Sequence, residues 1–398
     1  MPPTTRGAGF RFGITAATAV SFWCQPALAG DVKMRKQSTS AVSLREAVSN
    51  RFLIGAAIMS ARLDESPQAA MLARQFSSLT AENELKPRRL QPEPGHFDFA
   101  AGDRLAAFAS AHGMKVIGHT LCWHGAEPAW MFAGADGRPL PREQALANLE
   151  THIQTVMKHY RGKVLGWDVV NEALSDRGDE YLRDTPAHKA IGDDYVEKAF
   201  EFARAADPGA QLYYNDYAIE SVPKRDKAVR LLRSLKAKGL RVDAIGIQGH
   251  WHMDSLDPAG IEQAITEFQG EGVNVMITEL DLDVLPGRSG GADVNQAAGM
   301  RPELDPYAAG CPPAVLARQA QCYAELFRLF LRHRDVITRV TFWGADDGHS
   351  WLNNWPVKGR TNHALLFDRQ LRPKPAADAV ADVLQGSNPG GSAAVPTT

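Results

Sequence analysis

Short apolar runs alternate with longer amphipathic stretches along most of the chain. From Phe52 onward each apolar run is bounded by polar residues or glycine, and the stretches between repeat their apolar positions at helical spacing. Such alternation is typical of βαβ units around a parallel sheet. The runs predict strands at 52–58, 76–81, 115–119, 165–170, 211–215, 244–248, 273–278 and 339–343. Helices are predicted between them, for example over 142–160 and 224–238.

The number of units favours a closed barrel. Eight strand–helix alternations fit a (β/α)8 (TIM) barrel better than an open doubly wound sheet, which usually carries a glycine-rich phosphate loop. Neither a GxGxxG nor a Walker-type sequence occurs. Gly113, Gly239 and Gly272 follow helical stretches, where glycine is favoured as a cap. We therefore predict an α/β fold with one barrel domain over 30–387 and a disordered tail over 388–398.

The first 29 residues resemble a secretory signal peptide. Arg6 and Arg11 precede an apolar run over 12–23, and Ala27-Leu28-Ala29 has the small-x-small form of a cleavage site. The run is too short to cross a bilayer of about 30 Å as a helix. We predict cleavage at that site and a secreted or periplasmic protein without a membrane anchor. A lipid anchor at Cys24 is the alternative, disfavoured by the bulky residues before it.

Charge and cysteine content narrow the possible partners. Lys and Arg (44) nearly balance Asp and Glu (46), so the net charge is −2 and nucleic acid is not an expected partner. We expect a monomer. After cleavage, the cysteines closest in sequence are Cys311 and Cys322, which we predict to form a disulfide; two buried thiols are the alternative. Cys122 lies within a strand-like stretch and is expected to be a core thiol.

Polar side chains gather where the predicted strands end. In a (β/α)8 barrel the active site lies at the C-terminal ends of the strands. The strand ends carry the segments 82–86 (ENELK), 119–124 (HTLCWH), 167–172 (WDVVNE), 215–217 (NDY), 248–250 (QGH) and 278–281 (TELD), and Trp343. We therefore expect one pocket lined by these segments.

Two of the carboxylates in these segments are expected on opposite sides of the barrel mouth. Glu172 follows the fourth predicted strand and Glu279 follows the seventh. Two-step glycoside hydrolysis needs one carboxyl group to protonate the leaving oxygen and one to attack the anomeric carbon. A single glutamate at a strand end is more often only solvated or ion-paired. The pair, framed by the other strand ends, favours a glycosidase that uses neither a metal nor an organic cofactor.

Neighbouring residues suit a sugar-binding site. His250 and Asp281 are predicted to support Glu279 through an imidazole hydrogen bond, although a structural ion pair would also explain them. A metal site that includes His119, His124 and His250 is the alternative, disfavoured because no HxH pair closes the first strand. The predicted sugar contacts are Glu82, Asn83, Lys86, His119, Trp123, Trp343 and Trp351.

Together the motifs resemble those of the family 10 glycoside hydrolases, the endo-β-1,4-xylanases, from about Phe52 to Leu384. The resemblance implies that Glu172 is the general acid/base, that Glu279 is the nucleophile, and that hydrolysis retains the anomeric configuration. It implies that Tyr217 stacks on the leaving-group side and that Asn171 binds the 2-hydroxyl. The residues implied on the non-reducing side are Glu82, Asn83, Lys86, His119, Trp123, Asn171, Gln248, His250, Trp343 and Trp351.

The substrate implied by this resemblance is xylan or a xylo-oligosaccharide. Two residues depart from the usual family pattern: Cys122 stands where an aliphatic residue is usual, and Ala218 stands where Asn is common. The stretch 286–313 matches no family motif and is predicted to be a mobile or substrate-facing loop. A barrel glycosidase acting on β-glucan or aryl glycosides is one alternative. A carbohydrate-binding or inhibitor protein is another, although both glutamates are present.

Overall fold

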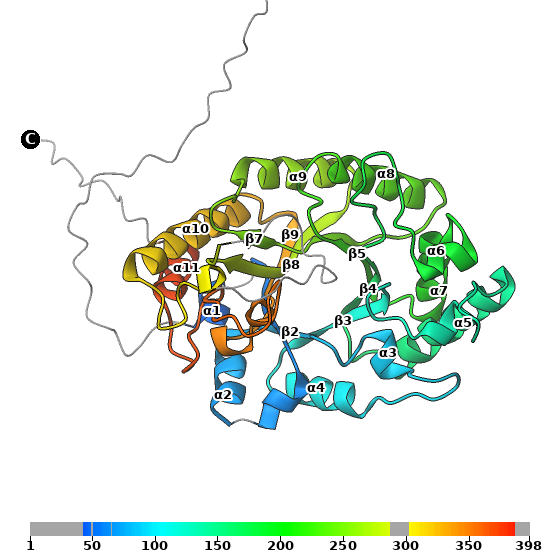
Figure 1. The fold of residues 1–398 in the computed structure, drawn as a ribbon, viewed down its shortest axis with the longest axis horizontal. Coiled ribbons are helices and arrows are strands. Elements are labelled where there is room, and N and C mark those ends of the chain that lie inside the picture. Colours follow the sequence, from blue (N-terminus) through cyan, green and yellow to red (C-terminus); the bar gives the residue numbers. More distant parts are fainter. Residues whose placement is uncertain (1–42, 49–50, 65, 287–301, 387–398) are drawn as a thin grey trace, which may run out of the picture. The chain divides into compact units, whose positions relative to one another are not determined.

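The strands form a closed ring in the computed structural model, which describes residues 43–48, 51–64, 66–286 and 302–386. Neighbouring strands are parallel, and pairing of β1 with β9 and of β6 with β8 closes the barrel (Figure 1). The strands of the ring are β1 (Leu53–Ile58), β2 (Ser78–Ala81), β3 (Lys115–Cys122), β4 (Gly166–Asn171), β5 (Gln211–Asp216), β6 (Ala244–Ile247), β8 (Asn274–Asp283) and β9 (Ile337–Phe342). The predicted (β/α)8 barrel is confirmed, and each predicted strand overlaps an observed one.

Helices surround this ring (Figure 1). They are α1 (Leu44–Val48), α2 (Ser66–Gln75), α3 (Pro87–Leu90), α4 (Ala100–Ala111), α5 (Arg142–His159), α6 (Pro186–Ile191), α7 (Tyr195–Ala206), α8 (Lys224–Ala237), α9 (Pro258–Gly270), α10 (Pro313–Arg332) and α11 (Pro375–Leu384). Short 3-10 helices cover Ser60–Asp64, Ala129–Met131, Pro302–Leu304, Asp347–His349 and Trp351–Asn353. Gly113, Gly239 and Gly272 have φ of 61°, 70° and 73°, which confirms the predicted caps.

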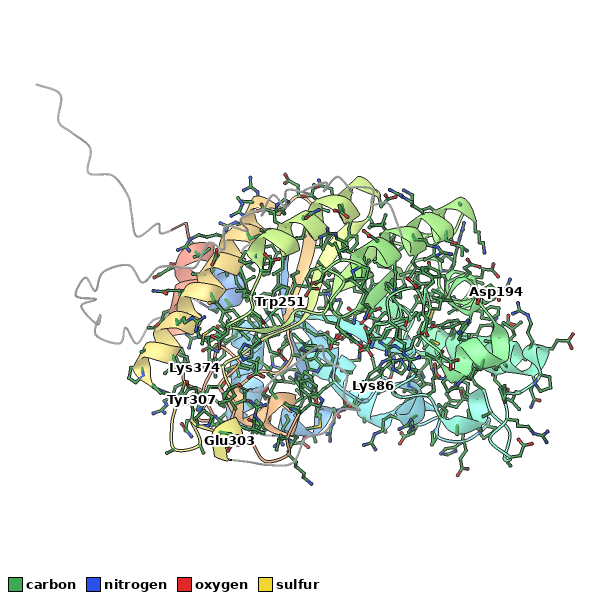
Figure 2. The ribbon with its side chains drawn as sticks, turned by 45° about the horizontal axis from the view of Figure 1, so that its top comes forward. Lys86, Asp194, Trp251, Glu303, Tyr307 and Lys374 are labelled. Atoms are coloured by element: carbon green, nitrogen blue, oxygen red, sulfur yellow. The ribbon has the colours of Figure 1, made fainter. Side chains whose placement is uncertain are left out.

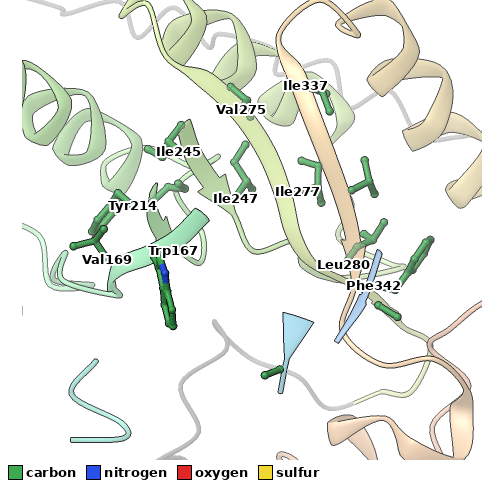
Figure 3. Packing of buried hydrophobic residues seen from close by; sticks show 14 of the residues in the cluster. Trp167, Val169, Tyr214, Ile245, Ile247, Val275, Ile277, Leu280, Ile337 and Phe342 are labelled. Atoms are coloured by element: carbon green, nitrogen blue, oxygen red, sulfur yellow. The ribbon is translucent and has the colours of Figure 1, made fainter. Parts of the chain in front are cut away.

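Alternate side chains of each strand pack on opposite faces of the barrel wall. Along β5, Tyr214 belongs to the large apolar cluster that also includes Ile245 and Val275 (Figure 3). The adjacent Tyr213 belongs instead to a small cluster with Met276, Ile117 and Ala244. This separation is expected because successive side chains of a strand point in opposite directions. Apolar burial on both faces makes the wall rigid and fixes the positions of the strand ends.

Two features of the strands were not predicted. A short strand, β7 (His250–His252), follows Gly249 and pairs with the last three residues of β8. β8 is also longer than predicted, so Glu279 lies within the strand rather than after it. In this pairing His250 stands opposite Asp281. The extension of β8 therefore sets the spacing between the histidine and the carboxylates described below.

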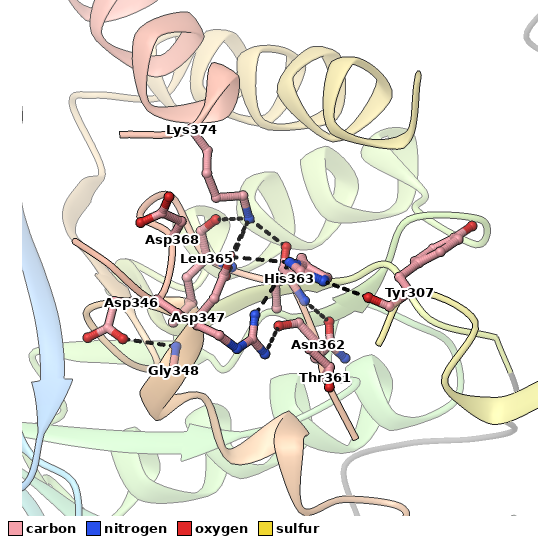
Figure 4. Close-up of polar contacts among 12 residues, drawn as sticks. Tyr307, Asp346, Asp347, Gly348, Thr361, Asn362, His363, Leu365, Asp368 and Lys374 are labelled. Carbon is pink, nitrogen blue, oxygen red and sulfur yellow. Dashed lines mark hydrogen bonds and ion pairs between the residues drawn. The ribbon is translucent and has the colours of Figure 1, made fainter. Parts of the chain in front are cut away.

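The loops after β9 are tied to α11 by a buried ion pair. The Nζ atom of Lys374 lies 3.0 Å from Oδ2 of Asp347 and donates hydrogen bonds to the carbonyl oxygens of His363 and Leu365 (Figure 4). Burial raises the pKa of Asp347 to about 6, although the charge of Lys374 opposes this rise. The pair anchors the segment that carries Trp351 to the rest of the barrel.

The predicted disulfide is wrong. Cys311 and Cys322 are not bridged, and neither is fully buried. Cys311 lies before α10, which begins at Pro313. Cys322 lies within this helix, nine residues after Pro313. At about 1.5 Å per residue, the helix carries Cys322 roughly 13 Å along its axis. A disulfide needs Cα atoms within about 7 Å. Cys122 is buried in the core, as predicted.

Several predictions concern residues that lie outside the described part of the chain. These residues are the signal peptide over 1–29, the tail over 388–398 and most of the loop 286–313. Within the described residues, no helix has the length and apolar character needed to span a bilayer.

Candidate active site

One hydrogen-bond network links the two predicted catalytic glutamates. Gln248 Nε2 donates to Glu172 Oε1 over 3.0 Å and also lies 3.3 Å from Asn171 Oδ1. Asn215 Nδ2 lies 2.9 Å from the same Asn171 oxygen and donates to Glu279 Oε1 over 2.7 Å. These residues come from the C-terminal ends of β4, β5 and β6 and from within β8, so closure of the barrel brings the two carboxyl groups into one site.

Glu172 is held in an unusual backbone conformation directly after β4. Its φ of 57° lies in the left-handed region, where side chains other than glycine are strained. Its second carboxyl oxygen, Oε2, accepts a hydrogen bond from Trp123 Nε1 over 2.8 Å. Burial raises the pKa of Glu172, and the charge of Asp216 adds to the rise, whereas the bonds from Gln248 and Trp123 oppose it. The site therefore favours the protonated form of this carboxyl group.

Glu279 has the opposite electrostatic environment. It is only 4% exposed, and burial by itself would raise its pKa. The hydrogen bond from His250, the charges of His119 and His250, and the bond from Asn215 together lower the pKa below its ordinary value. The site therefore stabilises the ionised carboxylate that a nucleophile requires.

His250 lies between two carboxylates, as predicted. Its Nε2 is 3.1 Å from Glu279 Oε2 and its Nδ1 is 2.9 Å from Asp281 Oδ2. Burial would lower the pKa of His250, but the charge of and hydrogen bond to Asp281, with those of Glu279, raise it to about 9. Near neutral pH both ring nitrogens therefore carry protons and donate. Trp351 Nε1 donates to the same Asp281 oxygen over 2.6 Å and helps to fix this carboxylate.

Lys86 lies in the same site, after β2 (labelled in Figure 2). Its Nζ donates to Asn83 Oδ1 over 3.1 Å and lies 4.8 Å from the centre of the Trp123 ring. Burial lowers the pKa of Lys86, and the charges of Glu279, Glu82 and Glu172 oppose that effect. The pKa of Glu82 is raised by burial, opposed by Lys86. These residues provide donors and acceptors suited to sugar hydroxyls.

Aromatic and imidazole rings form another part of the site. The ring of His119 meets that of Trp343 edge-on at 5.2 Å between centroids, and Trp343 lies 6.2 Å from the ring of His250. His119 Nδ1 lies 2.9 Å from Asp168 Oδ2, so this histidine also bonds a carboxylate. The ring centroids of Trp351 and His250 are 4.8 Å apart.

Among the described residues, no three His, Cys, Asp or Glu side chains are grouped as a metal site would require.

Tyr217 is more enclosed than a stacking platform would suggest. It is 5% exposed, and Lys224 Nζ lies 3.6 Å from the centre of its ring. Its hydroxyl accepts a hydrogen bond from Arg183 Nη2 over 2.7 Å and donates to Asp176. Lys224 occupies one face of the ring, so the stacking implied by the family resemblance could use only the other face or the edge.

Comparison with known proteins identifies the family. Residues 43–383 match the model of glycosyl hydrolase family 10. The chain belongs to this family. Endo-1,4-beta-xylanase A from Xylanibacter ruminicola is 41% identical over 342 residues, which cover 85% of this chain and 92% of that protein. An endo-1,4-beta-xylanase from Geobacillus stearothermophilus is 41% identical over 347 residues, covering 87% and 99%. The crystal structure of a Paenibacillus barcinonensis xylanase has a TM-score of 0.79 and 38% identity, covering 86% and 99%.

Several residues that organise this family 10 site lie in the polar segments found from the sequence but were given no role of their own. Asn215 bonds Glu279, and Thr278 Oγ1 donates to Asn215 Oδ1 over 2.6 Å, which orients the amide. Both residues lie at predicted strand ends, so their position was a usable signal. Gly246 faces the same amide, since an added Cβ would lie 2.3 Å from Asn215 Oδ1. Asp168 lies inside β4, in the segment 167–172 noted above, but its bond to His119 could not be predicted from the sequence.

Proposed function

We propose that this family 10 member is an endo-β-1,4-xylanase that cleaves xylan with retention, using Glu172 as general acid/base and Glu279 as nucleophile. The observation that carries the assignment of roles is the opposite displacement of the two pKa values, raised for Glu172 and lowered for Glu279. Two carboxyl groups whose environments separate their pKa values in this way can act as acid and nucleophile at one pH. The xylanase names of the relatives support the substrate.

In the first step Glu279 attacks the anomeric carbon of the sugar on the non-reducing side. Glu172 gives its proton to the glycosidic oxygen as the bond to that oxygen breaks, and the shortened chain leaves as an alcohol. The result is a glycosyl ester of Glu279. Asn215 and His250 each bond one oxygen of Glu279, so the carboxylate has one orientation before attack.

In the second step Glu172 acts as a base. Water attacks the anomeric carbon, Glu172 takes its proton, and the ester bond to Glu279 breaks. Esterification removes the charge of Glu279, which is one of the causes that raise the pKa of Glu172. The pKa of Glu172 therefore falls when the intermediate forms, as its change from acid to base requires. The two inversions give net retention.

The polar and aromatic residues around the carboxyl groups bind the sugar chain in this proposal. Lys86, Asn83 and Glu82 contact hydroxyls, and Trp343 and Trp351 provide ring surfaces. A signal peptide over 1–29 would export the enzyme, in keeping with a polymeric substrate outside the cytoplasm. We expect it to act there as a monomer.

The test compares the wild type with Glu172→Ala and Glu279→Ala on xylan, β-glucan and an activated aryl xyloside. Product anomers are followed by NMR. The wild type should release β-anomers from xylan first. With azide, Glu279→Ala should form an α-glycosyl azide and Glu172→Ala a β-glycosyl azide. Initial α-anomers from the wild type, or no azide product from either variant, would overturn the mechanism. Faster cleavage of β-glucan than xylan would overturn the substrate.

A further inference from the structure

A thiol and a carboxyl group form a buried pair behind Trp123. Cys122 ends β3 and is 2% exposed, and Glu127 follows in the next turn and is 6% exposed. The Cys122 thiol donates to Glu127 Oε1, with Sγ 3.2 Å from the oxygen. An aliphatic side chain at position 122 could not make this bond.

Glu127 ends a turn over residues 123–127, directly after Cys122, and this turn is fixed from several sides. Ala126 N donates to Trp123 O over 2.9 Å and closes the turn. Arg88, on α3, donates from its backbone N to Ala126 O over 2.8 Å and from Nη2 to Glu127 O over 2.9 Å. These contacts fix the backbone at the far end of the turn.

The Glu127 side chain reaches back to the beginning of the turn. Its pKa is raised to about 7 by burial, opposed by the Cys122 hydrogen bond, the charge of Arg88 and the backbone N–H of Trp123. The carboxyl group therefore interacts with Trp123 as well as with Cys122. Tyr195, on α7, is close enough for its pKa to be raised further by both residues of the pair, after the effect of burial. The other carboxyl oxygen, Oε2, is buried without a hydrogen-bond partner.

Trp123 transmits the geometry of this turn to the reaction centre. Its indole Nε1 donates to Glu172 Oε2 over 2.8 Å, and Lys86 lies over its ring. An indole group is rigid, so the position of its N–H follows from the backbone and two side-chain torsions. A buried carboxyl group is costly compared with an apolar side chain of similar size. The bond from Cys122 ties this carboxyl group to the residue directly before Trp123.

We propose that Cys122 and Glu127 are positioning residues that hold Trp123, and through it Glu172, in the geometry for proton donation. The proposal rests on the proposed function, because it assigns the general acid role to Glu172. Both side chains are buried, so we expect neither to contact the substrate. Their loss should impair the step in which the leaving oxygen is protonated and leave attack by Glu279 unaffected.

The test uses two aryl β-xylobiosides that differ in their need for a proton. Phenol is a poor leaving group and needs the general acid, whereas 2,4-dinitrophenolate leaves without one. We expect Glu127→Leu to lower kcat/KM about tenfold on the phenyl substrate and less than about twofold on the dinitrophenyl substrate. Glu127→Gln keeps an acceptor and should restore most of the loss. Cys122→Val should show the same selective loss, and Cys122→Ser, which keeps a donor, should not.

Equal losses on both substrates, or no loss in either Glu127→Leu or Cys122→Val, would overturn the proposal. If Glu127→Leu does not fold by circular dichroism, the two Cys122 variants decide, because they change neither charge nor the carboxyl group. Glu172→Ala serves as the reference and should show the strongest selective loss on the phenyl substrate. If it shows none, the proposed role of Glu172 fails, which is distinguishable from failure of the positioning role alone.

Discussion

Replacing Asn215 with alanine tests the link between the barrel and Glu279, the proposed nucleophile. Asn215 is fully buried and its amide nitrogen donates to Glu279 Oε1 over 2.7 Å. Thr278 fixes the amide by donating to its oxygen over 2.6 Å. In Asn215→Ala, His250 would still bond Glu279 Oε2, but Oε1 would lose its bond from Asn215. The carboxylate would then be free to rotate away from the line of attack.

The expected loss follows from the type of hydrogen bond. A bond to a charged group contributes about 1.5–3 kcal/mol, which corresponds to roughly 10- to 150-fold in kcat/KM if it is lost in the transition state. Thr278→Val removes only the neutral bond that orients the amide, so a loss of roughly 2- to 10-fold is expected. Asn215→Asp places a second negative charge beside Glu279, which should raise the pKa of Glu279 and move the acid limb of the rate profile to higher pH.

The assay is kcat/KM on phenyl and 2,4-dinitrophenyl β-xylobiosides, with thermal unfolding as the control for folding. Because Asn215 supports attack rather than proton donation, Asn215→Ala should lose activity on both substrates. A loss confined to the phenyl substrate would refute the reasoning, since it would place Asn215 with the acid. A loss of less than about twofold on both would show that this hydrogen bond does not position the nucleophile.

Three further predictions concern charge and thiol chemistry. The pKa of His250 is raised from 6.5 to about 9, so its charged form stabilises the folded protein fully below pH 6.5, and this contribution is lost as the pH rises through 9. The difference in unfolding free energy between wild type and His250→Gln, measured in urea, should therefore shrink from about pH 6 to pH 10. A constant difference would contradict this. Lys374→Met should destabilise the fold by about 3–5 kcal/mol, because it leaves the buried Asp347 carboxylate without its cationic partner. Adding Asp347→Asn should recover part of this loss in the same assay. A loss below about 1 kcal/mol for Lys374→Met would argue against the buried ion pair. Dithiothreitol should leave Tm unchanged, and alkylation of the unreduced, unfolded chain should label both Cys311 and Cys322 by mass spectrometry; recovery of a disulfide-linked peptide would contradict the structure.

Local pattern was sufficient to predict the strands and to single out the two glutamates proposed as catalytic. Apolar runs and amphipathic spacing report which face of each element is buried, and this information is local. The predicted strand ends led to Glu172 and Glu279, because in a closed parallel barrel every strand presents its C-terminal end to the same face, although β8 continues past Glu279 to Asp283. The predicted hydrogen bond of His250 to the Glu279 carboxylate is also present in the structure.

Tertiary contacts decided what local pattern could not. The disulfide prediction failed because the spacing of Cys311 and Cys322 does not show that a helix separates them. Tyr217 has the sequence context of a stacking residue, but Lys224 from α8 covers one face of its ring. A hydrogen-bond partner and the charge around a side chain come from segments far apart in the chain, so these properties exist only once the barrel closes.

The sequence by itself therefore determined the barrel, the positions of the two carboxyl groups and the family to which the chain belongs. Only the tertiary structure decided which glutamate is electrostatically suited to keep its proton and which to lose it. The physical reason is that a pKa depends on burial and on charges within a few ångströms. For Glu172 and Glu279 those charges come from other strands, including Asp216 on β5 and His250 on β7.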